Sequence, residues 1–119
     1  MDNKLFDSEL KVMEVLWREG GMTAGQLASI LKSEIGWNRN TTYTVIKKCI
    51  DKGAVERLEP NFRCKALITR EEVQGQETNE LINKMFDGSP EMFFATFLSE
   101  KNLTREQINN LKHLVDKLK

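Results

Sequence analysis

Apolar residues recur at helical spacing in three runs before residue 53, and capping residues or glycines bound each run. The first run predicts a helix over Ser8–Arg18, capped by the Ser8 hydroxyl. The second begins at a T-x-x-Q capping box, in which Thr23 and Gln26 bind free backbone N–H groups, and it ends before Gly36. Short helices joined by tight turns indicate a helix-turn-helix core.

The third run predicts a two-faced helix of about residues 38–52. Asn38 is expected to cap it, and Gly53 is expected to end it, because glycine enters the left-handed conformation cheaply. One face is apolar and carries Val45, Ile46, Cys49 and Ile50. The opposite face is polar, without acidic residues before Asp51, and carries Arg39, Asn40, Tyr43, Thr44 and Lys47. Such a face is typical of a recognition helix that reads DNA.

A hairpin is predicted directly after this helix. Its candidate strands are Ala54–Leu58 and Phe62–Ile68, and Glu59-Pro60-Asn61 between them has turn chemistry. Val55 and Ile68 are expected to face the core. The outward positions include three cations, Arg57, Arg63 and Lys65. The helix and hairpin together predict a winged helix-turn-helix with a basic wing.

The pattern changes after Thr69 to helices without strands. One helix is expected to run from a capping box at Thr69 to about Phe86. A second is expected to follow Ser89, with Pro90 at its first position, and a third is expected to follow Thr104. The fold class is therefore mostly α (α+β), with a winged helix in residues 1–70 and a helical region in residues 71–119.

The last two helices contain more large apolar residues than three short helices can bury. We expect a second copy of the chain to cover them through a two-fold interface, which makes the region a dimerisation region. The alternative is that the segment folds back onto the winged domain. The expected dimer contacts are Met92, Phe93, Phe94, Phe97, Leu98, Ile108, Leu111, Leu114 and Val115.

The charge distribution supports a nucleic-acid partner, although the 119-residue chain has a formal net charge of zero. Residues 36–70 contain 8 Lys and Arg against 3 Asp and Glu. Phosphate contacts need local positive charge and not a basic whole protein. The partner expected from this field is double-stranded operator DNA.

Other classes of function find little support in the sequence. The chain contains one histidine, no glycine-rich phosphate loop and no nucleophile elbow, so we expect neither an enzyme nor a cofactor or metal site. No apolar run is long enough to cross a bilayer, and the N-terminus has no signal-peptide core, so we expect a cytoplasmic protein without membrane insertion. Two distant cysteines give no disulfide framework, and Cys49 is expected to be a buried thiol.

The candidate DNA contacts on the third helix differ in their expected roles. Thr41 is placed to bind a phosphate together with the N–H groups at the helix start. Thr44 is placed to contact a base or phosphate, Tyr43 a sugar or phosphate, and Lys47 a guanine or the backbone. Arg39 and Asn40 sit at the start of the helix and suit either role.

The remaining basic residues are expected to contact the DNA backbone. Lys48 and Lys52 are predicted as flanking contacts. Arg57, Arg63 and Lys65 in the wing are predicted to follow the phosphates. The alternative for all of these positions is an ordinary solvated polar surface.

The order of these motifs resembles the penicillinase-repressor (BlaI/MecI/CopY) family of bacterial transcriptional repressors. The resemblance spans nearly the whole chain and no single piece of it is specific. The matching residues are the run LKVMEVLW ending at Trp17, Thr23-Ala24-Gly25-Gln26-Leu27, Trp37, Thr41, Val45, Lys52-Gly53 and Leu103-Thr104.

The resemblance implies a homodimeric repressor that binds palindromic operators. It also implies a membrane-bound metalloprotease sensor as partner, which cuts the repressor at an Asn-Phe bond in the dimerisation region. That bond corresponds to Thr96-Phe97 here, so the phenylalanine is kept and the asparagine is not. The family's copper-responsive branch has CxC pairs, which this sequence lacks. Two alternatives stay open, a winged-helix module that binds protein and a repressor released by a small ligand.

Overall fold

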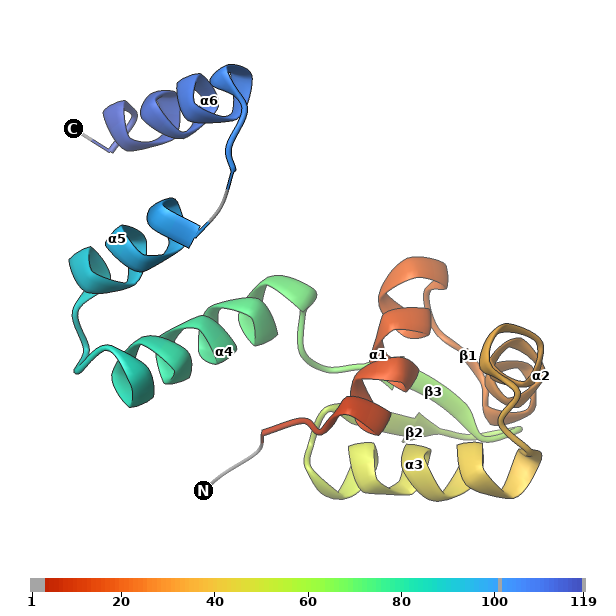
Figure 1. Cartoon of the computed structure of the whole chain (residues 1–119). Coiled ribbons are helices and arrows are strands. Elements are labelled where there is room, and N and C mark those ends of the chain that lie inside the picture. The colour runs from red at the N-terminus through yellow and green to blue at the C-terminus, as the bar shows by residue number, and fades with distance from the viewer. Residues whose placement is uncertain (1–3, 101, 119) are drawn as a thin grey trace. The chain divides into compact units, whose positions relative to one another are not determined.

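The computed structural model describes residues 4–100 and 102–118, and the chain forms two compact units that divide between Gln74 and Gly75 (Figure 1). The first unit contains three helices and a small sheet. The elements in chain order are α1 Asp7–Glu19, β1 Met22–Thr23, α2 Ala24–Ile35, α3 Arg39–Asp51, β2 Val55–Leu58, β3 Arg63–Ala66 and α4 Arg70–Met85, which continues into the second unit. The predicted mostly helical winged-helix architecture is confirmed.

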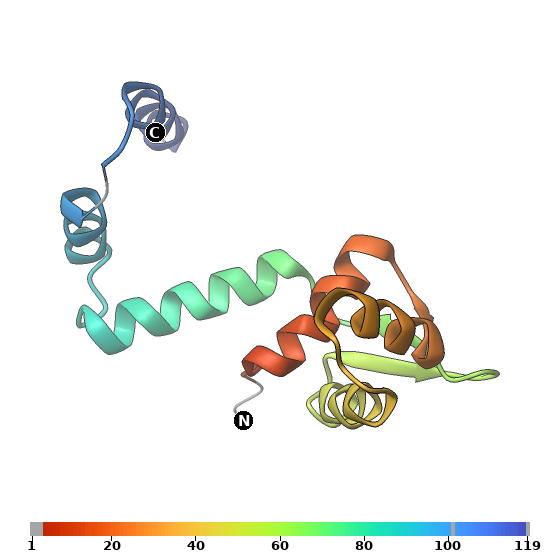
Figure 2. The same ribbon diagram turned by 45° about the vertical axis from the view of Figure 1, so that its right-hand side comes forward.

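The sheet is antiparallel and has the strand order β1-β3-β2. Val55 pairs with Ala66 across the hairpin, and Met22 pairs with Cys64 on the other side of β3. Both α1 and α3 pack against this sheet, and the turn between β2 and β3 lies at the edge of the unit (Figure 2). The two-residue strand β1 was not predicted, because its sequence reads only as the capping box of α2.

Most predicted helix boundaries are confirmed, and the hydrogen bonds of the predicted capping residues are present. Thr23 Oγ1 accepts from the N–H of Gln26, and Asn38 Oδ1 accepts from that of Thr41. Gly53 has φ +78 just after α3. The predicted Ser8 cap of α1 is wrong: the helix begins after Phe6, whose N–H donates to the Glu9 carboxylate at 2.7 Å. The Glu9 carboxylate therefore satisfies the N–H of the cap residue, and the Phe6 side chain offers no capping hydrogen bond to the first turn.

The core of the first unit collects the apolar faces of all its elements. Met13, Leu27, Leu31 and Ile46 are almost fully buried between the helices, and Val55 enters from β2. Burial of Val55 was predicted, and Ile68 packs against this core while staying partly exposed. The buried apolar faces fix the direction in which the opposite face of α3 points.

Both cysteines are buried free thiols in this core, as predicted for Cys49. Burial raises the pKa of Cys49 to about 12, helped by the nearby Glu9 carboxylate, and burial raises the pKa of Cys64 to about 11. The nucleophile in thiol chemistry is the thiolate, which the fold suppresses.

We expect neither cysteine to react with a thiol reagent at pH 8 until the protein unfolds. Both should react rapidly in urea, and the reaction with Ellman's reagent measures this. Because the unfolded thiols ionise near their ordinary pKa of 9.0 and the folded thiols do not, stability should fall as the pH rises from about 9 to about 12. Fast labelling of the folded protein would contradict the buried position.

A buried ion pair joins the start of α1 to the end of α3. Lys52 Nζ lies 2.6 Å from Oε1 of Glu9, and the Glu9 side chain is only 1% exposed. The same ammonium donates to the carbonyl of Lys4 and lies over the Phe6 ring. Lys52 therefore has a structural role within the fold, and its flanking contact with DNA stays a prediction.

The second unit contains the end of α4, then α5 Pro90–Glu100 and α6 Arg105–Asp116. The predicted caps are present: Ser89 Oγ accepts from the N–H of Met92, and Thr104 Oγ1 accepts from that of Gln107. None of the residues that the structure describes from Gly75 onward is fully buried. This unit therefore lacks a closed core within one chain.

Candidate nucleic-acid interface

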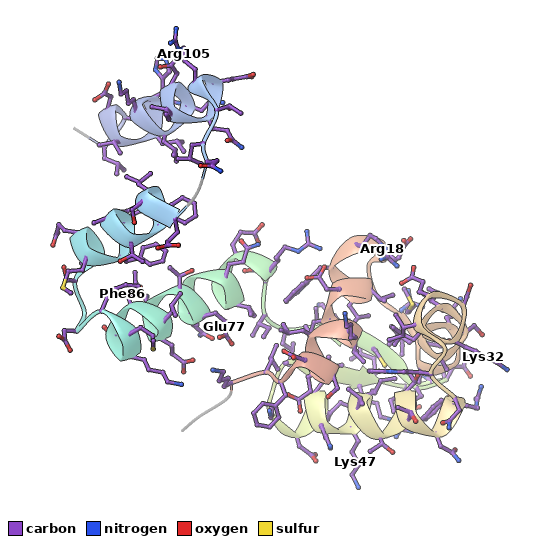
Figure 3. All side chains as sticks on the ribbon, in the orientation of Figure 1. Arg18, Lys32, Lys47, Glu77, Phe86 and Arg105 are labelled. Carbon is purple, nitrogen blue, oxygen red and sulfur yellow. The ribbon has the colours of Figure 1, made fainter. Side chains whose placement is uncertain are left out.

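The outward face of α3 is a continuous polar surface. The inward face buries Thr42, Val45, Ile46 and Cys49, so the residues between them point to solvent. Figure 3 shows the Lys47 side chain projecting away from the rest of its unit. The exposed positions are Arg39, Asn40, Thr41, Thr44, Lys47 and Lys48, and Tyr43 is half-buried.

The start of α3 is already capped, which changes the expected role of Thr41. Its N–H donates to Asn38 Oδ1 at 2.8 Å, so this amide is not free to bind a phosphate. The Thr41 side chain remains exposed beside it. A phosphate contact by Thr41 would therefore use the hydroxyl and not the amide.

Arg39 and Tyr43 form a pair one turn apart on this face. The Arg39 guanidinium donates to the Tyr43 hydroxyl at 2.8 Å and lies 4.8 Å from the centre of the ring. The Tyr43 ring forms a T-shaped pair with the Phe62 ring of the wing turn, with 5.8 Å between ring centroids and an 89° angle between planes. Neither residue is a freely rotating polar side chain.

The three predicted wing cations differ in how far they are already engaged. Arg57 Nε pairs with Glu59 at 2.6 Å, and this hydrogen bond holds the Glu59 pKa below its usual range. Arg63 donates to the backbone oxygen of Gly21 at 3.0 Å. Within the part of the chain that the structure describes, the Lys65 ammonium has no such partner. Lys65 is therefore the wing cation most available to a ligand.

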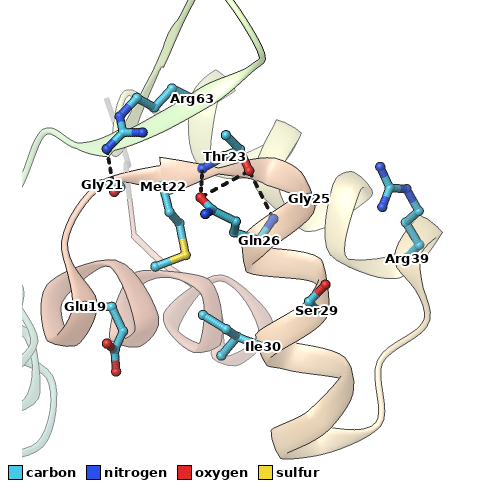
Figure 4. A pocket seen from close by; sticks show the side chains of 10 residues that line it. All are labelled: Glu19, Gly21, Met22, Thr23, Gly25, Gln26, Ser29, Ile30, Arg39 and Arg63. Carbon is cyan, nitrogen blue, oxygen red and sulfur yellow. Dashed lines mark hydrogen bonds between the residues drawn. The ribbon is translucent and has the colours of Figure 1, made fainter.

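An open groove of about 800 Å³ runs beside the start of α2. Arg63 lies on one side of it and Arg39 on the other, with Thr23, Gln26 and Ser29 between them (Figure 4). The groove brings a wing cation and a cation of α3 to one surface. Sequence reasoning identified Thr23 and Gln26 only as capping residues, and no signal in the sequence places them beside Arg63.

The described residues contain no group of three or more His, Cys, Asp or Glu side chains arranged to hold a metal ion. Among the same residues, no helix combines the length and apolarity that a membrane span requires.

The predicted dimer residues lie on α5 and α6 and are largely uncovered within the chain. Six of them are exposed: Met92, Phe94, Leu98, Ile108, Leu114 and Val115. Phe93, Phe97 and Leu111 are half-buried, and Phe93 contacts the rings of Phe86, Phe94 and Phe97. An apolar groove of about 660 Å³ follows the exposed residues of both helices.

The candidate cleavage bond lies inside a helix. Thr96 is exposed and Phe97 is half-buried, and both belong to α5. The carbonyl of Thr96 accepts a hydrogen bond from the Ser99 hydroxyl at 3.0 Å. This bond is therefore held in ordered helical backbone.

Comparison with known proteins connects this geometry to a family. The chain is 23% identical to the methicillin resistance regulatory protein MecI of Staphylococcus aureus over 98% of this chain and 99% of MecI. It is also 23% identical to the penicillinase repressor of Bacillus licheniformis, over 98% of this chain and 92% of the relative. The fold resembles the solution structure of the DNA-binding domain of the repressor BlaI, with a TM-score of 0.54 and 24% identity over 59% of this chain and 88% of that domain. The family model described as penicillinase repressor matches residues 5–117, and the chain therefore belongs to this family, as its motifs predicted.

Proposed function

We propose that this protein is a transcriptional repressor that binds operator DNA as a homodimer, through the outward face of α3 and the wing. The observation that carries the proposal is the exposed polar face of α3, which is backed by a buried apolar face. A helix held in this way can enter a major groove without exposing core residues. The family's repressors are not enzymes, which agrees with the sequence prediction.

The side chains suggest a division between base and backbone contacts. Thr44 and Lys47 lie in the middle of the exposed face, where a recognition helix approaches base edges. Arg63 and Lys65 extend the positive surface onto the wing, where phosphate contacts are usual. Arg57 contributes less positive field than its charge suggests, because Glu59 neutralises part of it.

The apolar residues of α5 and α6 support the dimer. Their uncovered side chains line one groove, and a second copy would bury them through a two-fold contact. A two-fold protein suits a palindromic operator whose half-sites lie about one to one and a half helical turns apart. Derepression by proteolysis at Thr96–Phe97 would require α5 to unwind first, because proteases cleave locally opened chain.

The proposal is tested by fluorescence anisotropy with a duplex from the gene's own promoter. We expect tight binding at moderate salt, much weaker binding to a scrambled duplex, and a steep loss of affinity as salt rises. Equal binding to both duplexes would show that the protein does not recognise an operator sequence. Absence of binding would favour the protein-interaction alternative.

Lys47→Ala should weaken binding to the promoter duplex by about 1–3 kcal/mol if the ammonium reads a base. The loss on scrambled DNA should be much smaller, because base contacts carry the sequence preference. Parallel anisotropy titrations measure the difference. An equal loss on both duplexes would make Lys47 a phosphate contact.

A further inference from the structure

Phe62 is a wing-turn residue that contacts three different elements. Its carbonyl accepts the N–H of Ala24 at the start of α2, at 2.9 Å. Its ring forms a T-shaped pair with the Tyr43 ring of α3, at 5.8 Å between centroids. The Arg57 guanidinium of β2 lies over the same ring, 3.7 Å from its centre. Phe62 is therefore the point where the wing turn meets both helices of the helix-turn-helix.

The contacts continue beyond Tyr43 and beyond Arg57. On α3, Arg39 binds the Tyr43 hydroxyl and also lies near the Tyr43 ring. On the wing, Arg57 is held to Glu59 by an ion pair. We call this row of five side chains the aromatic bridge: Arg39, Tyr43, Phe62, Arg57 and Glu59. It joins the outward face of α3 to the wing turn by ring and cation–π contacts, which have defined geometry.

The wing is anchored along β3, which pairs with β1 on its other side. The hairpin strands have only four residues each, and the wing turn extends beyond this pairing. Its turn contains two successive residues with positive φ, Asn61 at 74 and Phe62 at 48. The main-chain bond to Ala24 ties the turn to α2, whereas the Phe62 ring ties it to α3.

We propose that Phe62 is a positioning residue for DNA binding, and that its ring sets the spacing between the wing and the recognition helix. The inference rests on the proposed function, because that spacing matters when Lys47 and Lys65 contact one duplex together. A preorganised pair of contact surfaces loses less conformational freedom on binding than two that move separately. The ring of Phe62 supplies this preorganisation without touching the DNA itself.

The test compares Phe62→Leu with Phe62→Tyr in the full chain. Leucine keeps apolar volume but lacks the ring, whereas tyrosine keeps the ring. Both variants retain the main-chain bond to Ala24, and circular dichroism with thermal melting verifies the fold. We expect Phe62→Leu to bind the promoter duplex about tenfold more weakly. A loss of this size is typical when one side-chain contact with DNA is removed. Phe62→Tyr should bind within about twofold of wild type.

Two further measurements distinguish a positioning role of Phe62 from a general loss of stability. The slope of log affinity against log salt should fall by about 0.9 for each wing phosphate contact that Phe62→Leu loses. Lys65→Ala should weaken wild type but have little further effect in the Phe62→Leu protein, because its wing is already misplaced.

The outcomes distinguish this inference from the proposed function. If wild type binds no duplex, the proposed function fails and the inference fails with it. If wild type binds and Phe62→Leu binds equally well with the same salt slope, only the role of Phe62 is overturned. Full additivity of Phe62→Leu and Lys65→Ala would also overturn it.

Discussion

Replacing Lys52 by methionine is expected to lower the free energy of unfolding by about 3 kcal/mol, because removing one partner of a buried ion pair leaves an unpaired charge. Glu9 would remain 1% exposed without the ammonium that lies 2.6 Å from it. The change also removes the bond to the Lys4 carbonyl. Urea unfolding measures the effect through Trp17 and Trp37, which both pack against the core of the first unit.

Lys48→Met is the matched control, because Lys48 lies in the last turn of α3, close to Lys52 in sequence, with its side chain exposed. We expect it to change the free energy of unfolding by less than about 0.5 kcal/mol, as surface substitutions usually do. Adding Glu9→Gln to Lys52→Met should recover part of the loss, because the amide is neutral and can still accept from the Phe6 N–H. Equal losses for Lys52→Met and Lys48→Met would show that the ion pair does not stabilise the fold.

Leu114→Asp is expected to abolish the dimer at micromolar concentration. Leu114 is 58% exposed within the chain, so the substitution has little to disturb in one copy. In a two-fold interface each copy would bury a carboxylate without a partner, at a cost of several kcal/mol. The dimer dissociation constant should rise by at least about a hundredfold, which sedimentation velocity measures.

Asn109→Asp provides the control for charge, because Asn109 is an exposed polar residue of the same helix. This variant should remain a dimer. Phe97 is a poorer choice for the test, since it stacks on Phe93 and its loss would also disturb the second unit. A Leu114→Asp protein that still sediments as a dimer would place the interface elsewhere.

The helix boundaries were predictable because local chemistry determines them. Asn38, Thr23 and Thr104 accept backbone N–H groups three residues on, and each acts within one turn of its helix. The start of α1 was predicted wrongly because two local solutions competed. Ser8 has the usual capping hydroxyl, but Glu9 accepts the Phe6 N–H and also pairs with Lys52, which follows α3. That second partner is distant in sequence.

The polar face of α3 was also predictable, because helical periodicity alone separates it from Val45 and Cys49. The sequence could not predict which basic side chains remain available to bind DNA. Arg63 binds Gly21, and Arg57 is held across Phe62, through contacts that exist only after the sheet has formed. The sequence shows the charge of a side chain but not the partner that occupies it.

The most direct test of the central claim is an NMR titration of the full chain with the promoter duplex. If the outward face of α3 and the wing bind DNA, the largest amide shifts should fall at Asn40, Thr44, Lys47 and Lys65. Amides on the exposed side of α1, such as that of Lys11, should change little. Shifts concentrated on α1, with α3 and the wing unchanged, would contradict the account.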